Sequence, residues 1–375
     1  MSSPYRSWVE VSKQQIADNF RAVRAAVGPD VEAVAVVKSD AYGHGGIEIS
    51  RLLAAEGAHW LAVSSAEEGV ALRQAGLEPR ILVMADSLPY ACPALADYDL
   101  TPVVHSLADL PDLDAFAAAR GLRLRYHLKL DTGMGRLGTL AAAAEIAAAV
   151  RAANHLELEG LMSHFASAAD YTTNHAAAQS RAFEALCRDL RALGVAPAYR
   201  HLSSTTPIAY GWRDAWHNLV RPGLALYGYV SPSRGEAPPR ILDVKPALTW
   251  KATVLSTKDL PEGALVGYGG MFRAPRPTRI GVLGAGYADG LPHRLSNLGH
   301  VIAAGKLVPI LGAVSMDLLT IDLTDCPAIG AGDAVTLLGS EGGVSVDAHQ
   351  IARTAGTISY DILCGIRPRV KRVYI

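Results

Sequence analysis

The chain has 375 residues, of which 50% are hydrophobic and 19% are charged. This composition is that of a folded globular protein and excludes disordered and fibrous classes, and the length suits two domains. Lysine and arginine (35) balance aspartate and glutamate (36), for a formal charge of −1, so the chain lacks the basic excess of proteins that bind nucleic acid or anionic membranes. We therefore expect a small-molecule partner.

The first residues contain no apolar segment of a signal peptide, and no later stretch offers about 18 uninterrupted apolar residues. The cysteines are scattered without CxxC spacing and predict neither a zinc site nor a disulfide framework, so we expect no metal. They are Cys92, Cys187, Cys326 and Cys364. These features favour a cytoplasmic protein that does not enter a membrane.

Strand-like and helix-like segments alternate through the first part of the chain. Residues 11–27 predict an amphipathic helix, and the apolar run 33–37 predicts a buried strand that ends on Lys38. Further strands are expected at 60–63, 81–84, 102–104, 124–130, 156–162, 199–202 and 219–220, with helices at 66–74, 107–119, 140–152 and 175–193. Eight such strands predict a (β/α)8 TIM-type barrel, with a doubly wound sheet as the alternative.

A turn-rich segment at 231–239 ends this pattern. Short β-type runs follow at 248–255, 279–283, 307–311, 318–323, 334–338 and 370–375. We therefore predict a barrel domain over residues 1–235 and a mainly β C-terminal domain over residues 236–375. About 10 residues at the start of the chain are expected to pair with the second domain.

Polar side chains stand at the ends of the predicted barrel strands, where barrel active sites lie. They are Lys38, Lys129 with Arg136 in the glycine-rich turn after it, His164, Ser204 and Arg221. We interpret these strand ends as one shared pocket. A lysine out of bulk water favours its neutral amine, which can hold a cofactor aldehyde as a Schiff base.

Several segments resemble, in order along nearly the whole chain, segments of the alanine racemases. They are VVKSDAYGHG, HLKLDTGMGRLG, GLMSHFA, VRPGLALYG, VGYGG, GYADG, VSMD and ISYDILCGI. The resemblance implies a barrel enzyme that uses pyridoxal 5′-phosphate (PLP) to interconvert L-alanine and D-alanine, in a homodimer with shared active sites. The role it implies is to supply D-alanine for peptidoglycan or to catabolise it.

The resemblance also implies roles for single residues. Lys38 would carry PLP, Arg221 would face its pyridine nitrogen with His164 behind, and the phosphate would be held by Tyr42, Ser204, Tyr360 and the backbone of Gly223 and Leu224. Arg136 and the backbone N–H of Met316 would receive the substrate carboxylate. Many relatives have Asn-Ser-Ala where this chain has Ser-Thr-Thr at 204–206, so either Ser204 or Thr205 contacts the phosphate.

Arg221 favours racemisation over other PLP chemistry, because a guanidinium has no acceptor for a protonated pyridine nitrogen and, unlike a carboxylate, does not keep that nitrogen protonated. A racemase needs a base on each face of the α-carbon, and by the resemblance these are Lys38 and, from the partner subunit, Tyr268. Lys129 is expected to be carbamylated and to fix Arg136. The alternatives are a barrel decarboxylase and a non-catalytic PLP carrier, and acceptance of serine stays open.

Overall fold

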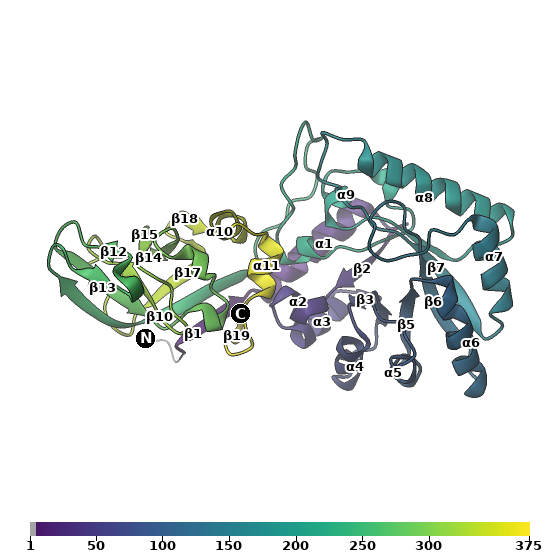
Figure 1. Ribbon diagram of the computed structural model, residues 1–375, viewed down its shortest axis with the longest axis horizontal. Helices are drawn as coiled ribbons and strands as arrows, with labels where there is room; N and C mark the ends of the chain where they lie inside the picture. Colours follow the sequence, from purple (N-terminus) through teal and green to yellow (C-terminus); the bar gives the residue numbers. More distant parts are fainter. Residues whose placement is uncertain (1–4) are drawn as a thin grey trace. The chain divides into compact units, whose positions relative to one another are not determined.

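The structure is a computed structural model that describes residues 5–375, and the chain folds into two compact units (Figure 1). Unit 1 is built from the start of the chain up to Gln14, from Tyr42–Gly45 and from Pro246–Ile375. Unit 2 is built from Gln15–Ala41 and Gly46–Lys245. Among the described residues, no helix is both long and apolar enough to cross a membrane.

Unit 2 contains an 8-stranded sheet in the order β8-β7-β6-β5-β4-β3-β2-β9. All of its strand pairs are parallel, and β9 returns to pair with β2. A bridge between Ser204 and Arg221, with the Arg221 N–H donating to Ser203 O at 2.9 Å, brings β8 and β9 together and closes the ring. The barrel is thereby confirmed over the doubly wound sheet. The strands are β2 (Glu32–Val36), β3 (Trp60–Val63), β4 (Arg80–Val83), β5 (Leu100–Val104), β6 (Leu124–Lys129), β7 (Leu156–Met162), β8 (Tyr199–His201) and β9 (Leu219–Val220).

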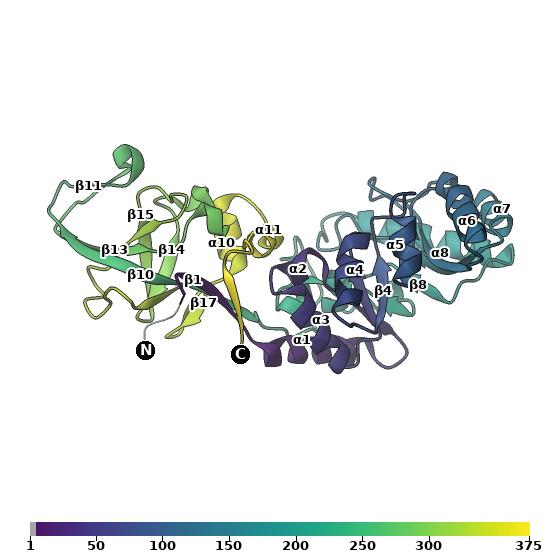
Figure 2. The same cartoon turned by 90° about the horizontal axis from the view of Figure 1, so that it is seen from below.

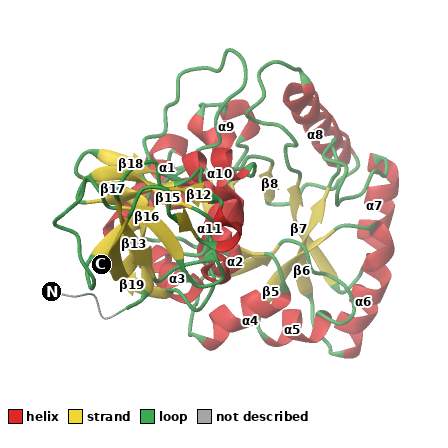
Figure 3. Ribbon diagram, turned by 60° about the vertical axis from the view of Figure 1, so that its left-hand side comes forward, coloured by secondary structure: helices red, strands yellow, loops and turns green. Residues whose placement is uncertain are grey.

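Helices surround these strands (Figure 3). Alternate residues of β6 face outward, where Tyr126 and Leu128 pack in one buried apolar cluster with Leu113, Ile146 and Phe183 of the surrounding helices. The helices are α1 (Lys13–Val27), α2 (Lys38–Tyr42), α3 (Gly46–Ala55), α4 (Ala66–Gln74), α5 (Cys92–Asp97), α6 (Leu110–Ala119), α7 (Ala143–Ala152), α8 (His175–Ala192) and α9 (Thr205–Ala209), with short 3₁₀ turns η1 (Leu107–Asp109), η2 (Arg213–Ala215) and η3 (Leu224–Tyr227).

Unit 1 is mainly β, as predicted, with a 9-stranded sheet in the order β18-β17-β14-β15-β16-β13-β10-β1-β19 and a separate hairpin of β11 and β12. Figure 2 shows the segment around β11 and its helical turn extending from this sheet. Its strands are β1 (Ser7–Val11), β10 (Leu248–Leu260), β11 (Leu265–Val266), β12 (Phe272–Arg273), β13 (Thr278–Leu283), β14 (His300–Ala303), β15 (Lys306–Leu311), β16 (Leu319–Asp322), β17 (Ala334–Glu341), β18 (Val344–Val346) and β19 (Lys371–Tyr374). Its helical segments are η4 (Tyr268–Gly270), η5 (Tyr287–Asp289), η6 (His293–Leu295), α10 (Ala348–Ala355) and α11 (Ser359–Cys364).

The division between the units falls at Lys245 and Pro246, whereas the turn-rich segment placed it at 235–236. Residues 236–245 stay with unit 2 because their backbone bonds to it: Ile241 N–H donates to Ala209 O at 2.8 Å, and Lys245 N–H to Asn19 Oδ1 at 3.0 Å. The start of the chain belongs to unit 1, where β1 pairs antiparallel with β10 and parallel with β19.

Candidate active site

Lys38 follows β2 after one intervening residue and opens a left-handed turn. Residues 39–41 have φ angles of 54°, 53° and 52°, although none of them is glycine. Two carboxylates hold the turn in place: Glu68 accepts the N–H of residue 39 at 2.7 Å, and Asp40 accepts the N–H of Gly46 at 2.6 Å. Left-handed backbone costs about 1–2 kcal/mol per residue, so the surroundings of Lys38 maintain a conformation that the local sequence disfavours.

Lys129 ends β6 and is only 4% exposed. Burial and then the charge of Arg136 lower its pKa from 10.5 to about 8, so an appreciable share of the amine is neutral near pH 8. The turn that carries Arg136 is organised by Asp131, whose Oδ1 accepts the N–H groups of Gly133 and Met134, each at 2.9 Å. The sequence-predicted pair of lysine and arginine therefore stands on one strand end.

Arg221 follows β9 and is 3% exposed. Its Nη1 donates to His201 Nδ1 at 2.8 Å, and its Nη2 lies 3.3 Å from His164 Nδ1 and donates to the carbonyl oxygens of Ser163 (2.7 Å) and Leu202 (3.1 Å). The guanidinium is thus fixed by four neighbours from β7, β8 and the turns after them. No carboxylate of the described residues contacts it directly.

Residues 204 and 205 differ in what their hydroxyls touch. Thr205 Oγ1 accepts the backbone N–H of Gly223 at 3.2 Å and of Ala225 at 3.1 Å. The Ser204 side chain makes no such contact, and its backbone bridges to Arg221. Thr205 therefore places its hydroxyl against the loop that contains Gly223 and Leu224.

The carboxyl end of the barrel carries an excess of positive charge. Burial, followed by the charges of Arg221, Lys129, Arg136 and Lys38, lowers the pKa of His164 to about 3. An aldehyde that carries a phosphate dianion, joined by a substrate carboxylate, would meet an amine, two guanidinium groups, a hydroxyl and backbone amides here. The donor set of unit 2 therefore fits PLP and an amino acid.

In unit 1, the rings of Tyr42 and Tyr360 lie 5.9 Å apart, so two predicted phosphate ligands from distant parts of the sequence meet in the same unit. Burial, then the neighbouring Tyr360, raises the pKa of Tyr42, which stays a neutral donor. Gly43 leaves room for this arrangement, since a Cβ there would lie 2.3 Å from Leu363 O.

The other two predicted residues of unit 1 lie on exposed turns. Tyr268 begins η4 after the β11 strand and is 78% exposed. Met316 is exposed as well, and its carbonyl accepts the N–H of Ala288 at 2.9 Å. Arg369 fixes this turn by pairing with Asp289 and with Asp317, each at 2.9 Å.

The sequence interpretation assigned no role to three polar residues that the barrel encloses: His127, Glu159 and His201. The sequence feature that could have identified them is the alternation of side chains along a strand. In β6 this alternation puts His127 on the same face as Lys129 and on the face opposite to Tyr126 and Leu128. A polar residue on the inward face of a buried strand needs a partner, and His201 is that partner for His127 at 2.8 Å.

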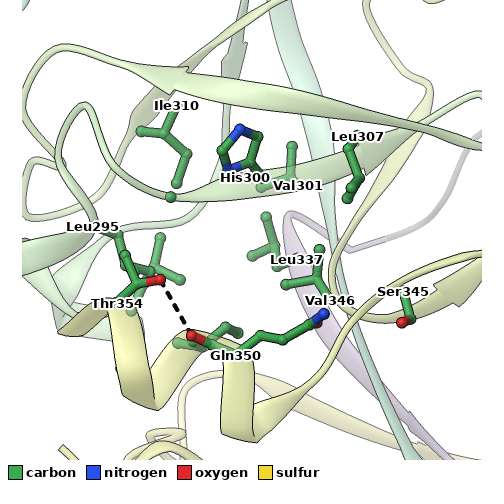
Figure 4. A pocket seen from close by; sticks show the side chains of 13 residues that line it. Leu295, His300, Val301, Leu307, Ile310, Leu337, Ser345, Val346, Gln350 and Thr354 are labelled. Atoms are coloured by element: carbon green, nitrogen blue, oxygen red, sulfur yellow. Dashed lines mark hydrogen bonds between the residues drawn. The ribbon is translucent and has the colours of Figure 1, made fainter. Parts of the chain in front are cut away.

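A pocket in unit 1 is distinct from these residues and has a volume of about 170 Å³. Figure 4 shows Leu295, Val301, Ile310, Leu337 and Val346 around it, beside α10. None of the predicted site residues lines it. Within the described part of the chain, no group of histidine, cysteine and carboxylate side chains is arranged to hold a metal ion.

Comparison with known proteins gives a consistent result. The family model of the alanine racemase N-terminal domain matches residues 11–232, and that of the C-terminal domain matches residues 247–374. The alanine racemase of Halothermothrix orenii is 38% identical over 369 residues, which cover 98% of this chain and 96% of that protein.

Two solved structures extend the likeness to three dimensions. The alanine racemase from a D-cycloserine-producing Streptomyces lavendulae has a TM-score of 0.92 and 34% identity, covering 100% of this chain and 98% of that one. The alanine racemase of Bartonella henselae, solved with covalently bound pyridoxal phosphate, has a TM-score of 0.87 and 28% identity, covering 99% and 100%. Both units, and the order in which the chain builds them, are those of one family: the chain belongs to the alanine racemases.

Proposed function

We propose that this alanine racemase interconverts L-alanine and D-alanine by a two-base mechanism, with Lys38 on one face of the α-carbon and Tyr268 of a partner subunit on the other. The observation that carries the proposal is the cluster of Lys38, Arg136 and Arg221 at the carboxyl end of the barrel in a member of this family. When bound, PLP supplies an electron sink for the α-carbon of an amino acid.

Lys38 would hold the cofactor, and neutral donors would hold its phosphate. These donors are Tyr42, Tyr360, the hydroxyl of Ser204 or Thr205, and the backbone of the turn at Gly223 and Leu224, where the Gly223 N–H would exchange its bond to Thr205 Oγ1 for one to the phosphate. The contacts of Thr205 with the amides of Gly223 and Ala225 favour Thr205 as the hydroxyl that takes part. Such donors position a dianion without neutralising it.

Arg221 would face the pyridine nitrogen, with His164 hydrogen-bonded to it from behind. Since a guanidinium can only donate hydrogen bonds, it pairs with an unprotonated pyridine nitrogen and leaves the ring a weaker electron sink than a carboxylate, which would keep that nitrogen protonated. A weak sink favours the return of a proton to the α-carbon, which is what racemisation requires. This property argues against a decarboxylase.

Two groups would move the α-proton and two would hold the substrate. The amine of Lys38 takes or gives the proton of the D-isomer, and the phenol of Tyr268 that of the L-isomer. The guanidinium of Arg136 and the N–H of Met316 hold the carboxylate, which fixes the α-carbon between the two bases.

Lys129 would carry a carbamate. Its neutral amine attacks carbon dioxide, a proton leaves to water, and the resulting anion lies beside Arg136. The pKa of about 8 supplies that neutral amine near physiological pH. An anion here would fix the guanidinium that binds the substrate carboxylate.

A homodimer with shared sites is part of the proposal. Tyr268 is 78% exposed on its own chain, and large apolar side chains nearby, Leu265 and Met271, are more than half exposed. Such side chains on a projecting hairpin are typical of a surface that another subunit covers. The partners that we propose are alanine and a second copy of the chain. We propose that the protein binds neither nucleic acid nor membranes and acts in the cytoplasm. Supply of D-alanine for peptidoglycan and its catabolism are the two roles proposed.

Turnover of purified protein with PLP tests the proposal. L-alanine should yield D-alanine in a coupled assay, serine should be run beside it, and Lys38→Ala should be inactive and lack the visible absorption of bound cofactor. The matched control is Lys258→Ala, at an exposed position of β10, which should keep wild-type activity. Cofactor binding by the wild-type protein without turnover of alanine would instead identify a carrier.

A further inference from the structure

A continuous chain of polar side chains runs from Arg221 through the interior of the barrel. Beyond the contact of Arg221 with His201, His201 Nε2 lies 2.8 Å from His127 Nδ1. His127 Nε2 lies 3.5 Å from Glu159 Oε2, an electrostatic contact without the geometry of a hydrogen bond. The same Glu159 oxygen accepts from Arg80 Nη2 at 2.5 Å. Arg221 follows β9 at the carboxyl end of the barrel, and Arg80 begins β4 at the amino end. This row of side chains therefore connects the two ends of the barrel.

The direction of each hydrogen bond in this chain follows from its first member. An arginine can only donate, so His201 Nδ1 must accept, and its proton must sit on Nε2. His201 Nε2 then donates to His127 Nδ1, which leaves the proton of His127 on Nε2, directed at Glu159. Both histidines are therefore neutral, in agreement with burial, which lowers the pKa of each.

The packing around the chain is built to hold it. Gly160 lies beside His127 in the β6–β7 pair, and a Cβ on it would lie only 2.6 Å from His127 Nδ1. The Trp60 ring contacts His127 edge-on at 5.7 Å, and the Arg80 guanidinium lies 3.9 Å above that same Trp60 ring. The His127 imidazole therefore occupies a fitted space that holds it against His201.

The charges along the chain complement each other. Arg221 is buried, and its direct neighbours are carbonyl oxygens and imidazoles. A buried charge with no counter-ion is costly. The nearest carboxylate beyond the two imidazoles is Glu159, 3.5 Å from His127 Nε2. Burial alone would raise the pKa of Glu159, but the neighbouring His127 and Arg80 outweigh it and lower this pKa to about 2, so Glu159 is an anion.

From this geometry we infer that Glu159 is a positioning residue for Arg221. Its carboxylate polarises His127, which polarises His201, and the strengthened Nδ1 acceptor of His201 balances the charge of Arg221 and holds the guanidinium in place. A buried charge beside the first imidazole and a hydrogen bond between the two imidazoles polarise one another in this way when water is excluded. The effect on catalysis rests on the proposed function, in which Arg221 faces the cofactor, whereas the hydrogen-bond pattern itself does not.

Nitrogen-15 NMR of histidine side chains in the holoenzyme tests the pattern on the wild-type protein. His127 and His201 should both show the neutral form with the proton on Nε2, with no titration between about pH 6 and pH 9. A proton on Nδ1 of either ring, or a doubly protonated ring, would overturn the inference. The protonation states of His127 and His201 can be measured whether or not the protein racemises alanine. A failure of the proposed function would therefore be distinguished from a failure of this inference.

Glu159→Gln keeps the shape of the side chain and removes its charge. The Nε2–H proton signals of His127 and His201 should both move upfield. We also expect kcat/KM for alanine to fall by about 10-fold, a loss typical of residues that orient the groups in direct contact with a bound ligand. The matched control is Glu184→Gln. Glu184 pairs with the buried His217 at 3.2 Å, and neither residue belongs to the row of side chains from Arg221 to Arg80. This control should change neither signal. A Glu159→Gln protein with the His201 signal and kinetics of the wild type would reduce Glu159 to an anchor for Arg80 and contradict the inference.

Discussion

At the scale of single residues, the site depends on hydroxyls and amines whose neighbours set their roles. Ser204 and Thr205 are adjacent in sequence and chemically alike, yet only Thr205 contacts the amides at Gly223 and Ala225. The sequence could not choose between them, because the choice depends on which hydroxyl faces a loop that follows about twenty residues later, after β9.

The two hydroxyls can be separated by their effect on cofactor affinity. Thr205→Val should raise the Kd for PLP by about 10-fold or more, because a hydroxyl bonded to an anion contributes about 1.5–3 kcal/mol. Thr205→Ser should restore the affinity, and Ser204→Ala should change it little. Absorbance titration of the apoprotein with PLP measures all three. A larger loss for Ser204→Ala than for Thr205→Val would reassign the contact to Ser204.

Lys129 gives a prediction with a defined pH dependence. Its pKa falls from 10.5 to about 8, so the neutral amine that reacts with carbon dioxide becomes the main form as the pH rises through about 8. The carbamate signal in a carbon-13 spectrum under labelled bicarbonate should therefore be stronger at pH 8.5 than at pH 6.5, and absent in Lys129→Ala.

The same variant should show the purpose of the carbamate. Lys129→Ala should raise KM for alanine by misplacing Arg136, and small carboxylates should partly restore activity by taking the place of the missing anion. Wild-type kinetics for Lys129→Ala, together with no carbamate signal in the wild type, would remove the modification from the account.

At the scale of elements, the left-handed turn after Lys38 is the feature that local sequence least predicts. Residues 39–41 include no glycine, and the tertiary contacts from Glu68 and Asp40 impose the conformation. By contrast, Leu156–Met162 and Ala66–Gln74 were predicted residue for residue, because apolar patterning alone defines a buried strand and a surface helix.

The strain in this turn should be measurable at Ser39, which is exposed. Ser39→Gly should raise the free energy of unfolding by about 0.5–1 kcal/mol, since glycine adopts positive φ without the steric cost and loses only part of this gain to chain entropy. The matched control, Ser345→Gly in strand β18, where φ is not positive, should lower stability by about 0.5–1 kcal/mol. Denaturant unfolding measures both, and a loss of stability at Ser39 would show that its turn is not strained.

At the scale of the whole molecule, the alternation of strands and helices predicted the barrel but could not exclude a doubly wound sheet, since both folds share that alternation. What distinguishes them is closure, through the bridge of Ser204 with Arg221, and no periodicity reports it. The division of contacts at Lys245 and Pro246 lies beyond the predicted boundary at 235–236 for a similar reason: a proline- and glycine-rich segment shows where the chain turns, and not which unit its backbone bonds to.

The central claim is that each active site takes Lys38 from one subunit and Tyr268 from the other, and mixed dimers test it most directly. Co-expressed Lys38→Ala and Tyr268→Phe chains, each inactive alone, should pair at random into about half mixed dimers, in which one site carries both defects and the other carries none. Activity should return to about a quarter of the wild-type value, or about half in the purified mixed dimer. A mixed dimer that binds PLP but remains inactive would show that Tyr268 acts within its own subunit and would contradict the shared-site account.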